Sequence, residues 1–108
     1  MKLNDFAKLC HERSVAKGWH DPPPSVGEQV ALLHSEVSEI LEEYRKQPHP
    51  FALRVEEGKP EGIPAEVADV FIRLMQFCGQ YGIDVDAAVD VKMTHNLTRQ
   101  RRHGGKRL

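Results

Sequence analysis

Four acidic residues form two pairs, each with a three-residue spacing inside a segment whose apolar residues recur at helical intervals. The pairs are Glu36 with Glu39 and Glu66 with Asp69. Because residues three apart lie on one face of a helix, each pair presents two carboxylates side by side. Two such helices packed together would bring four carboxylates to one place, where raised pKa values or bound cations relieve the repulsion. Oxygen-only clusters favour Mg²⁺ or Mn²⁺ over zinc, so the pattern predicts a hard divalent metal and phosphate chemistry.

The spacing alone is weak evidence, because 16 acidic residues in a chain of 108 produce about two such pairs by chance. Glu39 and Glu42 form an incidental pair of this kind. The surrounding residues strengthen the signal, because the first pair borders an apolar helical stripe and the second lies on the polar stripe of an otherwise apolar helix. A buried carboxylate needs a partner. That partner is either a metal ion or, as the structural alternative, a salt bridge between Asp69 and Arg73.

The length of the chain and its composition predict a single domain that covers residues 1–108. The net charge of -1 gives no general attraction to nucleic acid or to a membrane. No apolar run reaches the roughly 20 residues of a membrane span, and the N-terminus lacks the pattern of a signal peptide. Cys10 and Cys78 have no metal-ligand spacing and lie on apolar helix faces, which predicts reduced core thiols in a cytoplasmic protein.

The periodicity of apolar residues predicts an all-α bundle of four helices. Ser25 and Glu28 form a capping-box pattern at the start of the second helix, and Asp84 is a cap for the fourth. Residues 47–62 show no sustained period and are predicted to be the main loop, and no segment alternates as a strand does. The four helices are expected at about residues 4–17, 25–46, 64–81 and 84–99.

The fourth predicted helix carries a line of polar donors. Lys92, Asn96, Arg99 and His103 are spaced four, three and four apart, so they share one face if the helix continues that far. Lysine and arginine are cationic donors to phosphate oxygens, and an asparagine amide binds phosphate or metal-bound water. A solvated basic helix with a cationic tail over residues 103–107 explains the same residues without a site.

The acidic and basic motifs together resemble the MazG-like nucleoside triphosphate pyrophosphohydrolases over almost the whole chain. The resemblance implies an all-α, MazG-like bundle that needs Mg²⁺, with Mn²⁺ as a substitute, and cleaves a nucleoside triphosphate between its α and β phosphates. It also implies a homodimer or homotetramer with pockets built partly from neighbouring subunits; apolar residues on several sides of the central helices favour the same. The resemblance rests on the motifs Glu36-Val-Ser-Glu39, Glu61-Gly-Ile-Pro-Ala-Glu66-Val-Ala-Asp69 and Lys92-x-x-x-Asn96-x-x-Arg99.

The same resemblance implies roles for the acids and the donors. Glu39 is our choice for the base that activates water, because a capable base is not fully occupied by metal, and Lys92 would stabilise the leaving pyrophosphate. Glu43, one turn further along the acidic stripe, is a candidate extra ligand. The implied metal ligands are Glu36, Glu39, Glu66 and Asp69, and the implied phosphate contacts are Lys92, Asn96 and Arg99.

The sequence gives weaker signals for the residues that would bind the nucleobase of the substrate. His11 and Trp19 lie in the first helix and the turn after it, where related deoxycytidine triphosphatases hold the base, and a tryptophan ring can stack on a base face. The structural alternative is that Trp19, the single tryptophan, packs into the core. The identity of the nucleotide stays open.

Three other kinds of protein compete with this interpretation. A ferritin-like di-iron bundle also gathers helical carboxylates but needs Glu-x-x-His motifs, and none occurs in the chain. A phosphoribosyl-ATP pyrophosphatase would share the fold and chemistry and differ in substrate. A non-catalytic helical adaptor, or a nucleic-acid-binding protein that uses the basic tail, would have no need of acids beside the core. Metal-dependent pyrophosphate release separates the enzymes from this last class.

Overall fold

The computed structural model describes residues 2–99 and shows four helices with a small two-stranded sheet. The prediction of a mainly helical protein is therefore confirmed at the level of class. Each helix begins and ends within a few residues of its predicted limits. The elements are α1 (Leu3–Ala16), α2 (Val26–Lys46), β1 (Arg54–Glu56), β2 (Lys59–Glu61), α3 (Ile63–Gln80) and α4 (Val85–Leu97).

Local capping accounts for the helix limits. The Ser25 hydroxyl accepts the backbone N–H of Glu28 and the Glu28 carboxylate accepts the N–H of Ser25, so the predicted capping box is present. Asp84 accepts the N–H of Ala87 at the start of α4. Gly18, just past the end of α1, has a φ of 82°, a left-handed conformation that glycine adopts without strain.

Residues 47–62, which the sequence predicts to be the main loop, contain the antiparallel hairpin β1–β2, so the expectation that the chain has no strand is wrong. Glu56 pairs with Lys59, and the two residues between them, Glu57 and Gly58, both have positive φ. Two such residues form the tight turn whose twist suits a hairpin. Strands of three residues are too short to show alternation, and Pro60 within β2 further weakens the sequence signal.

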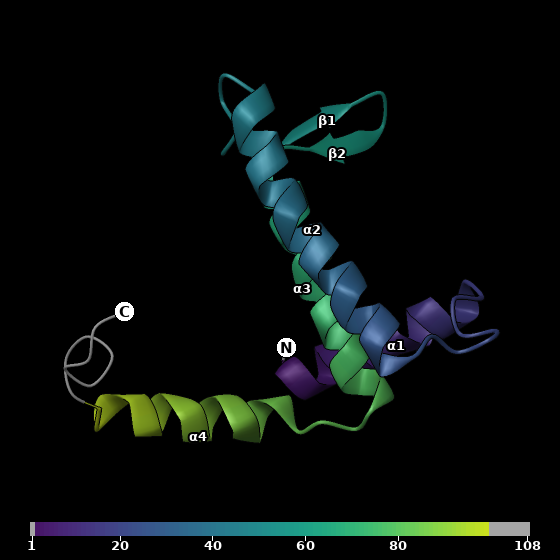
Figure 1. Cartoon of the computed structure of the whole chain (residues 1–108), viewed down its shortest axis with the longest axis vertical. Helices are drawn as coiled ribbons and strands as arrows, with labels where there is room; N and C mark the ends of the chain where they lie inside the picture. Colours follow the sequence, from purple (N-terminus) through teal and green to yellow (C-terminus); the bar gives the residue numbers. More distant parts are fainter. Residues whose placement is uncertain (1, 100–108) are drawn as a thin grey trace.

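Helices α2 and α3 form a long antiparallel pair, with the hairpin at its far end and α1 across its near end (Figure 1). The pairing is set by contacts that run in opposite directions along the two helices, from Gln29 with Gln76 to Glu36 with Arg73. Helix α4 leaves the near end of this pair and projects away from it (Figure 1). Among the described residues, no helix is both long and apolar enough to cross a membrane.

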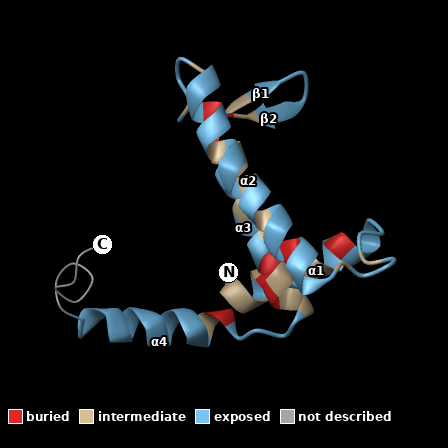
Figure 2. Cartoon of the chain, in the orientation of Figure 1, coloured by how far each residue is buried: buried red, intermediate tan, exposed pale blue. Residues whose placement is uncertain are grey.

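The core is small and lies where α1, α3 and the start of α4 meet (Figure 2). Cys10 and Cys78 are buried free thiols there, as the sequence predicts, and burial raises the pKa of both. Within residues 2–99 no large side chain is completely buried. Large apolar side chains stay exposed along α2, α3 and α4, including Leu32, Val37, Leu41, Val67, Phe71, Val89, Val91, Met93 and Leu97.

Two helix N-termini cap each other at this core. The side-chain oxygen of Asn4 accepts the backbone N–H groups of Val85 and Asp86 at 2.8 and 3.2 Å. In return, the carboxylate of Asp86 accepts the N–H groups of Leu3 and Asn4 at 3.0 and 3.1 Å. These bonds satisfy N–H groups that a helix cannot satisfy internally. They join the starts of α1 and α4, which are some 80 residues apart in the chain.

Candidate metal centre and adjoining pocket

Three of the four predicted acids meet between α2 and α3. Glu36, Glu39 and Glu66 each offer one carboxylate oxygen, and these oxygens lie within 4.8 Å of one another. Glu66 belongs to the first turn of α3, where an acidic side chain complements the positive end of the helix dipole. The antiparallel pairing places this turn opposite the middle of α2, which carries the other two acids.

Asp69 lies beside this cluster and outside it. Its side chain is exposed and lines the neighbouring pocket together with Glu36. Its charge also contributes to the raised pKa of Glu66. The structure therefore brings three of the predicted metal ligands together and places the fourth at the edge of the same region.

Glu66 has the most perturbed electrostatic environment of the cluster. Burial raises its pKa most strongly, followed by the contact with Glu39 and the charges of Asp69 and Glu43, and together they bring it to about 7. The Oε2 atom of Glu66 is buried without a hydrogen-bond partner among the described residues. An orphaned carboxylate oxygen within a group of acids is a position that a cation would satisfy.

Two arginines engage neighbouring acids, and neither pair is the one that the sequence suggests. Arg73 does not bridge to Asp69 on its own helix; its guanidinium lies 3.2 Å from Glu36 on α2. Glu43, the candidate extra ligand, is buried and held at 3.1 Å by Arg54 of the hairpin. Glu43 therefore serves to attach β1 to α2, and it adds negative charge near Glu66 without joining the cluster.

A pocket of about 750 Å³ adjoins the cluster and lies between α1, the turn after it, α2 and α3. Its volume is within the range of small-molecule sites. Apolar atoms form most of its surface although many of the lining residues are polar, and the two acids Glu36 and Asp69 lie on its lining together with Arg73. The lining residues are Phe6, Leu9, Cys10, Arg13, Ser14, Lys17, Trp19, His20, Pro24, Gln29, Leu32, Glu36, Asp69, Ile72, Arg73 and Gln76.

A chain of hydrogen bonds runs along the polar wall of the pocket. Gln76 donates through Nε2 to the Oε1 of Gln29 at 2.7 Å. Its own Oε1 lies 2.9 Å from Nε2 of His20, and the same histidine nitrogen lies 3.0 Å from Oγ of Ser14. Ser14, Gln29 and Gln76 are buried. These polar groups satisfy one another, which holds the wall in one arrangement.

The two residues predicted to hold a base lie in different places. Trp19 is 58% exposed and lines the pocket, so the alternative that it packs into the core is wrong. The Arg73 guanidinium carbon lies 5.8 Å from the centre of its ring, within the range of a cation–π contact. His11 is outside the pocket lining; its Nδ1 lies 3.3 Å from Oε1 of Gln76, and its ring meets that of His20 edge-on at 5.0 Å.

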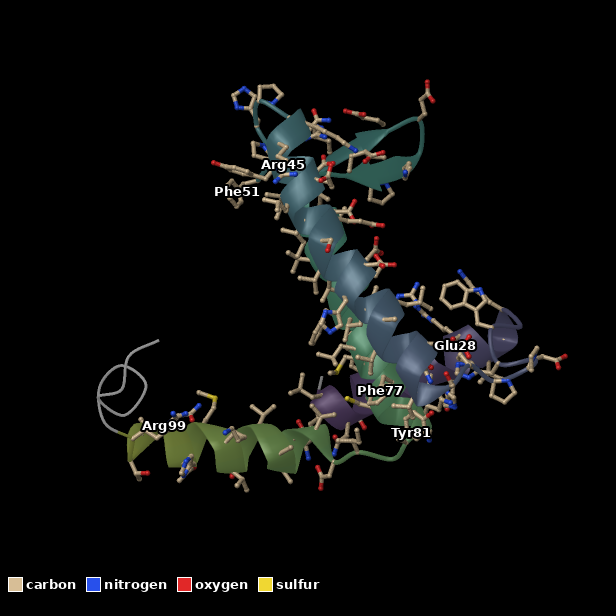
Figure 3. All side chains as sticks on the ribbon, in the orientation of Figure 1. Glu28, Arg45, Phe51, Phe77, Tyr81 and Arg99 are labelled. Atoms are coloured by element: carbon tan, nitrogen blue, oxygen red, sulfur yellow. The ribbon has the colours of Figure 1, made fainter. Side chains whose placement is uncertain are left out.

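The predicted phosphate contacts are not brought to the cluster within one chain. Lys92 and Asn96 lie on α4, are exposed and do not line the pocket. Arg99 follows the end of α4 and lies at its far end, away from the α2–α3 pair (Figure 3). His103 and the tail at residues 104–107 are outside the described residues.

Several residues of the site escaped the sequence analysis. Ser14, His20, Gln29, Arg73 and Gln76 line the pocket, and the sequence suggested a specific partner only for Arg73, the salt bridge to Asp69. Ser14 shares a face with apolar residues of α1, and a polar residue on an apolar face was the available signal. Gln76 continues the polar stripe of Glu66, Asp69 and Arg73 on α3. His20 gave no such signal, because it follows the helix and meets α3 only through the tertiary fold.

The donor set fits a hard divalent cation. Glu36, Glu39 and Glu66 offer only carboxylate oxygens, the ligands that Mg²⁺ and Mn²⁺ prefer, and one of these oxygens has no partner among the described residues. The fold and the site define a mainly helical protein with a carboxylate cluster at the edge of a pocket that has both apolar and charged lining residues. Comparison of the chain with protein-family models, with curated proteins and with solved structures found no match.

Proposed function

We propose that this protein is a metal-dependent nucleoside triphosphate pyrophosphohydrolase of the MazG-like kind, which cleaves its substrate to a monophosphate and pyrophosphate. The observation that carries the proposal is the position of the carboxylate cluster. Glu36, Glu39 and Glu66 converge from two helices at the edge of a pocket of about 750 Å³. A nucleoside in the pocket would then extend its phosphates toward the acids, which is the arrangement that phosphoryl chemistry requires.

Glu36, Glu39 and Glu66 would hold a Mg²⁺ ion, with Asp69 at hand beside them. Such an ion would supply charge neutralisation for the phosphates and activation of the attacking water. Glu39 is exposed and so remains our candidate for the group that takes the proton from that water. Glu36 and Glu66 are half-buried ligand candidates, whereas Glu39 is both a ligand candidate and the acid most accessible to water.

The pocket would hold the nucleoside. Trp19 offers an exposed ring at its edge for stacking on a base. The apolar wall formed by residues such as Leu9 and Ile72 would exclude water from the other face. Gln76 and His20 line this wall with their hydrogen-bonding groups fixed by each other, so a base would meet a rigid polar edge.

Lys92, Asn96 and Arg99 would act on the site of another copy. Helix α4 projects from the body of its own chain (Figure 1) and exposes Met93 and Val91. Burial of these apolar side chains against a neighbour would stabilise a dimer or tetramer. A helix so placed would bring its cationic donors to a partner's phosphates, where they would stabilise the leaving pyrophosphate.

The test is pyrophosphate release from a panel of ribo- and deoxyribonucleoside triphosphates, with Mg²⁺, with Mn²⁺ and with EDTA. We expect metal-dependent release of pyrophosphate and a monophosphate in equal amounts. Glu39→Gln should lower kcat by at least about 100-fold, in the range of loss of a catalytic base. Glu42→Gln is the matched control, because Glu42 lies on the same helix, exposed and paired with Arg45.

Two results would count against the proposal. If the wild-type protein releases no pyrophosphate from any triphosphate of the panel, a helical adaptor or an enzyme with a different class of substrate is favoured. Equal activities of Glu39→Gln and Glu42→Gln would show that the acid cluster does not take part in the reaction.

A further inference from the structure

Arg73 stands at the boundary between the carboxylate cluster and the pocket. Its Nη2 lies 3.2 Å from Oε1 of Glu36, and the two side chains are only 28% and 19% exposed. On its other side the guanidinium lies over the ring of Trp19. Arg73 also lines the pocket itself. A single cationic group therefore contacts a cluster acid, the aromatic edge and the space that a ligand would fill.

Glu36 has two competing partners in this arrangement. It belongs to the group of three acids whose oxygens lie within 4.8 Å of one another, and it is also paired with Arg73. In the protein without a metal, the guanidinium offsets part of the repulsion among these acids. A divalent cation held by Glu36, Glu39 and Glu66 would take over that compensation. Arg73 would then be a partly buried cation that faces the pocket, because its partner Glu36 would be bound to the metal.

The guanidinium suits a second anion. Its planar set of donors can bind two phosphate oxygens at once, and stacking on an aromatic ring keeps its plane oriented. The Arg73 guanidinium carbon lies 5.8 Å from the centre of the Trp19 ring, and both side chains line the pocket. A phosphate that projects from the pocket toward the cluster would therefore find Arg73 on the same lining as the acids Glu36 and Asp69.

We propose that Arg73 is a phosphate-binding residue that exchanges Glu36 for a phosphate oxygen of the nucleotide when the carboxylates hold a divalent cation. This inference rests on the proposed function. It implies that the metal binds first and the phosphate second, because Arg73 is available to the phosphate only after Glu36 coordinates the metal. By linkage, metal and triphosphate then strengthen each other's binding by the same factor.

The exchange can be followed without catalysis, because Trp19 is the only tryptophan of the chain and contacts Arg73. Its fluorescence should change when Mg²⁺ is added to the wild-type protein and change again when inorganic triphosphate is added in saturating Mg²⁺. In Arg73→Gln the response to Mg²⁺ should disappear. Arg45→Gln is the matched control, since Arg45 is an exposed arginine paired with Glu42 on α2, and it should respond as the wild type does.

Calorimetry gives the second readout, and it should show opposite changes in the two affinities. Arg73→Gln removes the cation that competes for Glu36, so Mg²⁺ should bind on the order of fivefold more tightly. The same variant loses a phosphate donor, so inorganic triphosphate in saturating Mg²⁺ should bind about tenfold more weakly. Arg73→Lys keeps the charge and should recover part of the triphosphate affinity. Far-UV circular dichroism and thermal unfolding establish that each variant is folded.

The outcomes separate the two proposals. If wild-type protein binds no divalent cation, the proposed metal centre and the exchange both fail. If the wild type binds Mg²⁺ while Arg73→Gln keeps the wild-type triphosphate affinity and fluorescence response, Arg73 is a static link between α2 and α3. The exchange alone then fails. Opposite shifts in the two affinities, absent from Arg45→Gln, would establish it.

Discussion

The Nε2 atom of His20 lies 2.9 Å from Oε1 of Gln76, and this contact determines which nitrogen of the imidazole carries a proton. Because Gln76 donates its amide to Gln29 at 2.7 Å, its oxygen faces His20 and must accept. His20 is therefore protonated at Nε2, and the Ser14 oxygen, 3.0 Å from the same nitrogen, also faces a donor. On the polar wall of the pocket, hydrogen bonds therefore run outward from His20, to Ser14 on one side and through Gln76 to Gln29 on the other.

Gln76→Leu should destabilise the protein because it removes the acceptor of His20 Nε2 on α3 and the donor to the buried Oε1 of Gln29. The expected loss is about 1–3 kcal/mol in the free energy of unfolding, the range for stranded buried polar groups. Gln80→Leu is the comparison, because the Oε1 of Gln80 is buried without a partner among the described residues, so its loss should cost little or should stabilise. Urea unfolding of both variants measures the difference, and equal losses would contradict the role of the network.

Glu66→Gln should change the pH dependence of stability. The pKa of Glu66 is raised to about 7 in the folded protein, so the folded state binds this proton more tightly than the unfolded chain does. The stabilisation is fully present below the unfolded pKa of about 4.5 and is lost as the pH rises through about 7. Above pH 7, the metal-free variant should exceed the wild type by up to about 3 kcal/mol.

Below pH 4.5 the variant and the wild type should be nearly equal in stability, because the wild-type carboxyl is then protonated in both states. Urea unfolding in EDTA at a series of pH values measures this, with Glu42→Gln as the control for an exposed acid. If the stability of Glu66→Gln and that of the wild type change with pH in parallel, the fold does not raise the pKa of Glu66.

Gly79→Ala should weaken the packing of α1 on α3. A Cβ atom at this position would collide with the backbone carbonyl of Ala7 and with the Cβ of His11, so one helix must shift. The expected loss is about 1–3 kcal/mol, as for overpacked cores. Gly27→Ala is the matched control, since a Cβ there meets only Ser25 Oγ at 4.0 Å and should stabilise the helix by about 0.5–1 kcal/mol. Thermal unfolding of the pair should give shifts of opposite sign.

Asn4→Ala should loosen α4 from α1. The variant removes the acceptor for the N–H groups of Val85 and Asp86 and the donor to Asp84, with an expected loss of about 1–2 kcal/mol. The hydrogen bond from Asn4 also lowers the pKa of Asp84, so this interaction stabilises the fold above the ordinary aspartate pKa and fades as the pH falls. Hydrogen exchange in α4 measures the loss, and Thr94→Ala on the exposed part of α4 should leave exchange unchanged.

Mixed variants test whether α4 acts on a neighbouring subunit. Glu39→Gln and Lys92→Gln should each be nearly inactive alone. If the two residues of one site come from different chains, a dimer formed from both variants has one intact site. Random mixing of dimers would then restore about a quarter of wild-type activity. Activity that stays at the level of the separate variants would place Lys92 either in the same chain's site or outside the reaction.

Local signals of the sequence determined where the helices begin and end. Ser25, Asp84 and Gly18 act through atoms within a few residues of themselves, so their effect can be read without knowledge of the fold. The acidic spacing likewise determined that Glu36 and Glu39 share a helical face. The hairpin was missed because its twist depends on two turn residues, and its attachment depends on Arg54 reaching Glu43 across the fold.

Only the tertiary structure decided which groups face each other. Arg73 is closer in sequence to Asp69, yet it pairs with Glu36. The antiparallel packing of α2 and α3 places the face of α3 that carries Arg73 against the face of α2 that carries Glu36. The same packing leaves Glu66 half-buried beside Glu39, 27 residues away in the chain, and the partial burial and this neighbour raise the pKa of Glu66. Spacing along a helix specifies a face, whereas the partner of that face is set by apolar contacts distributed over the whole molecule, which no single motif encodes.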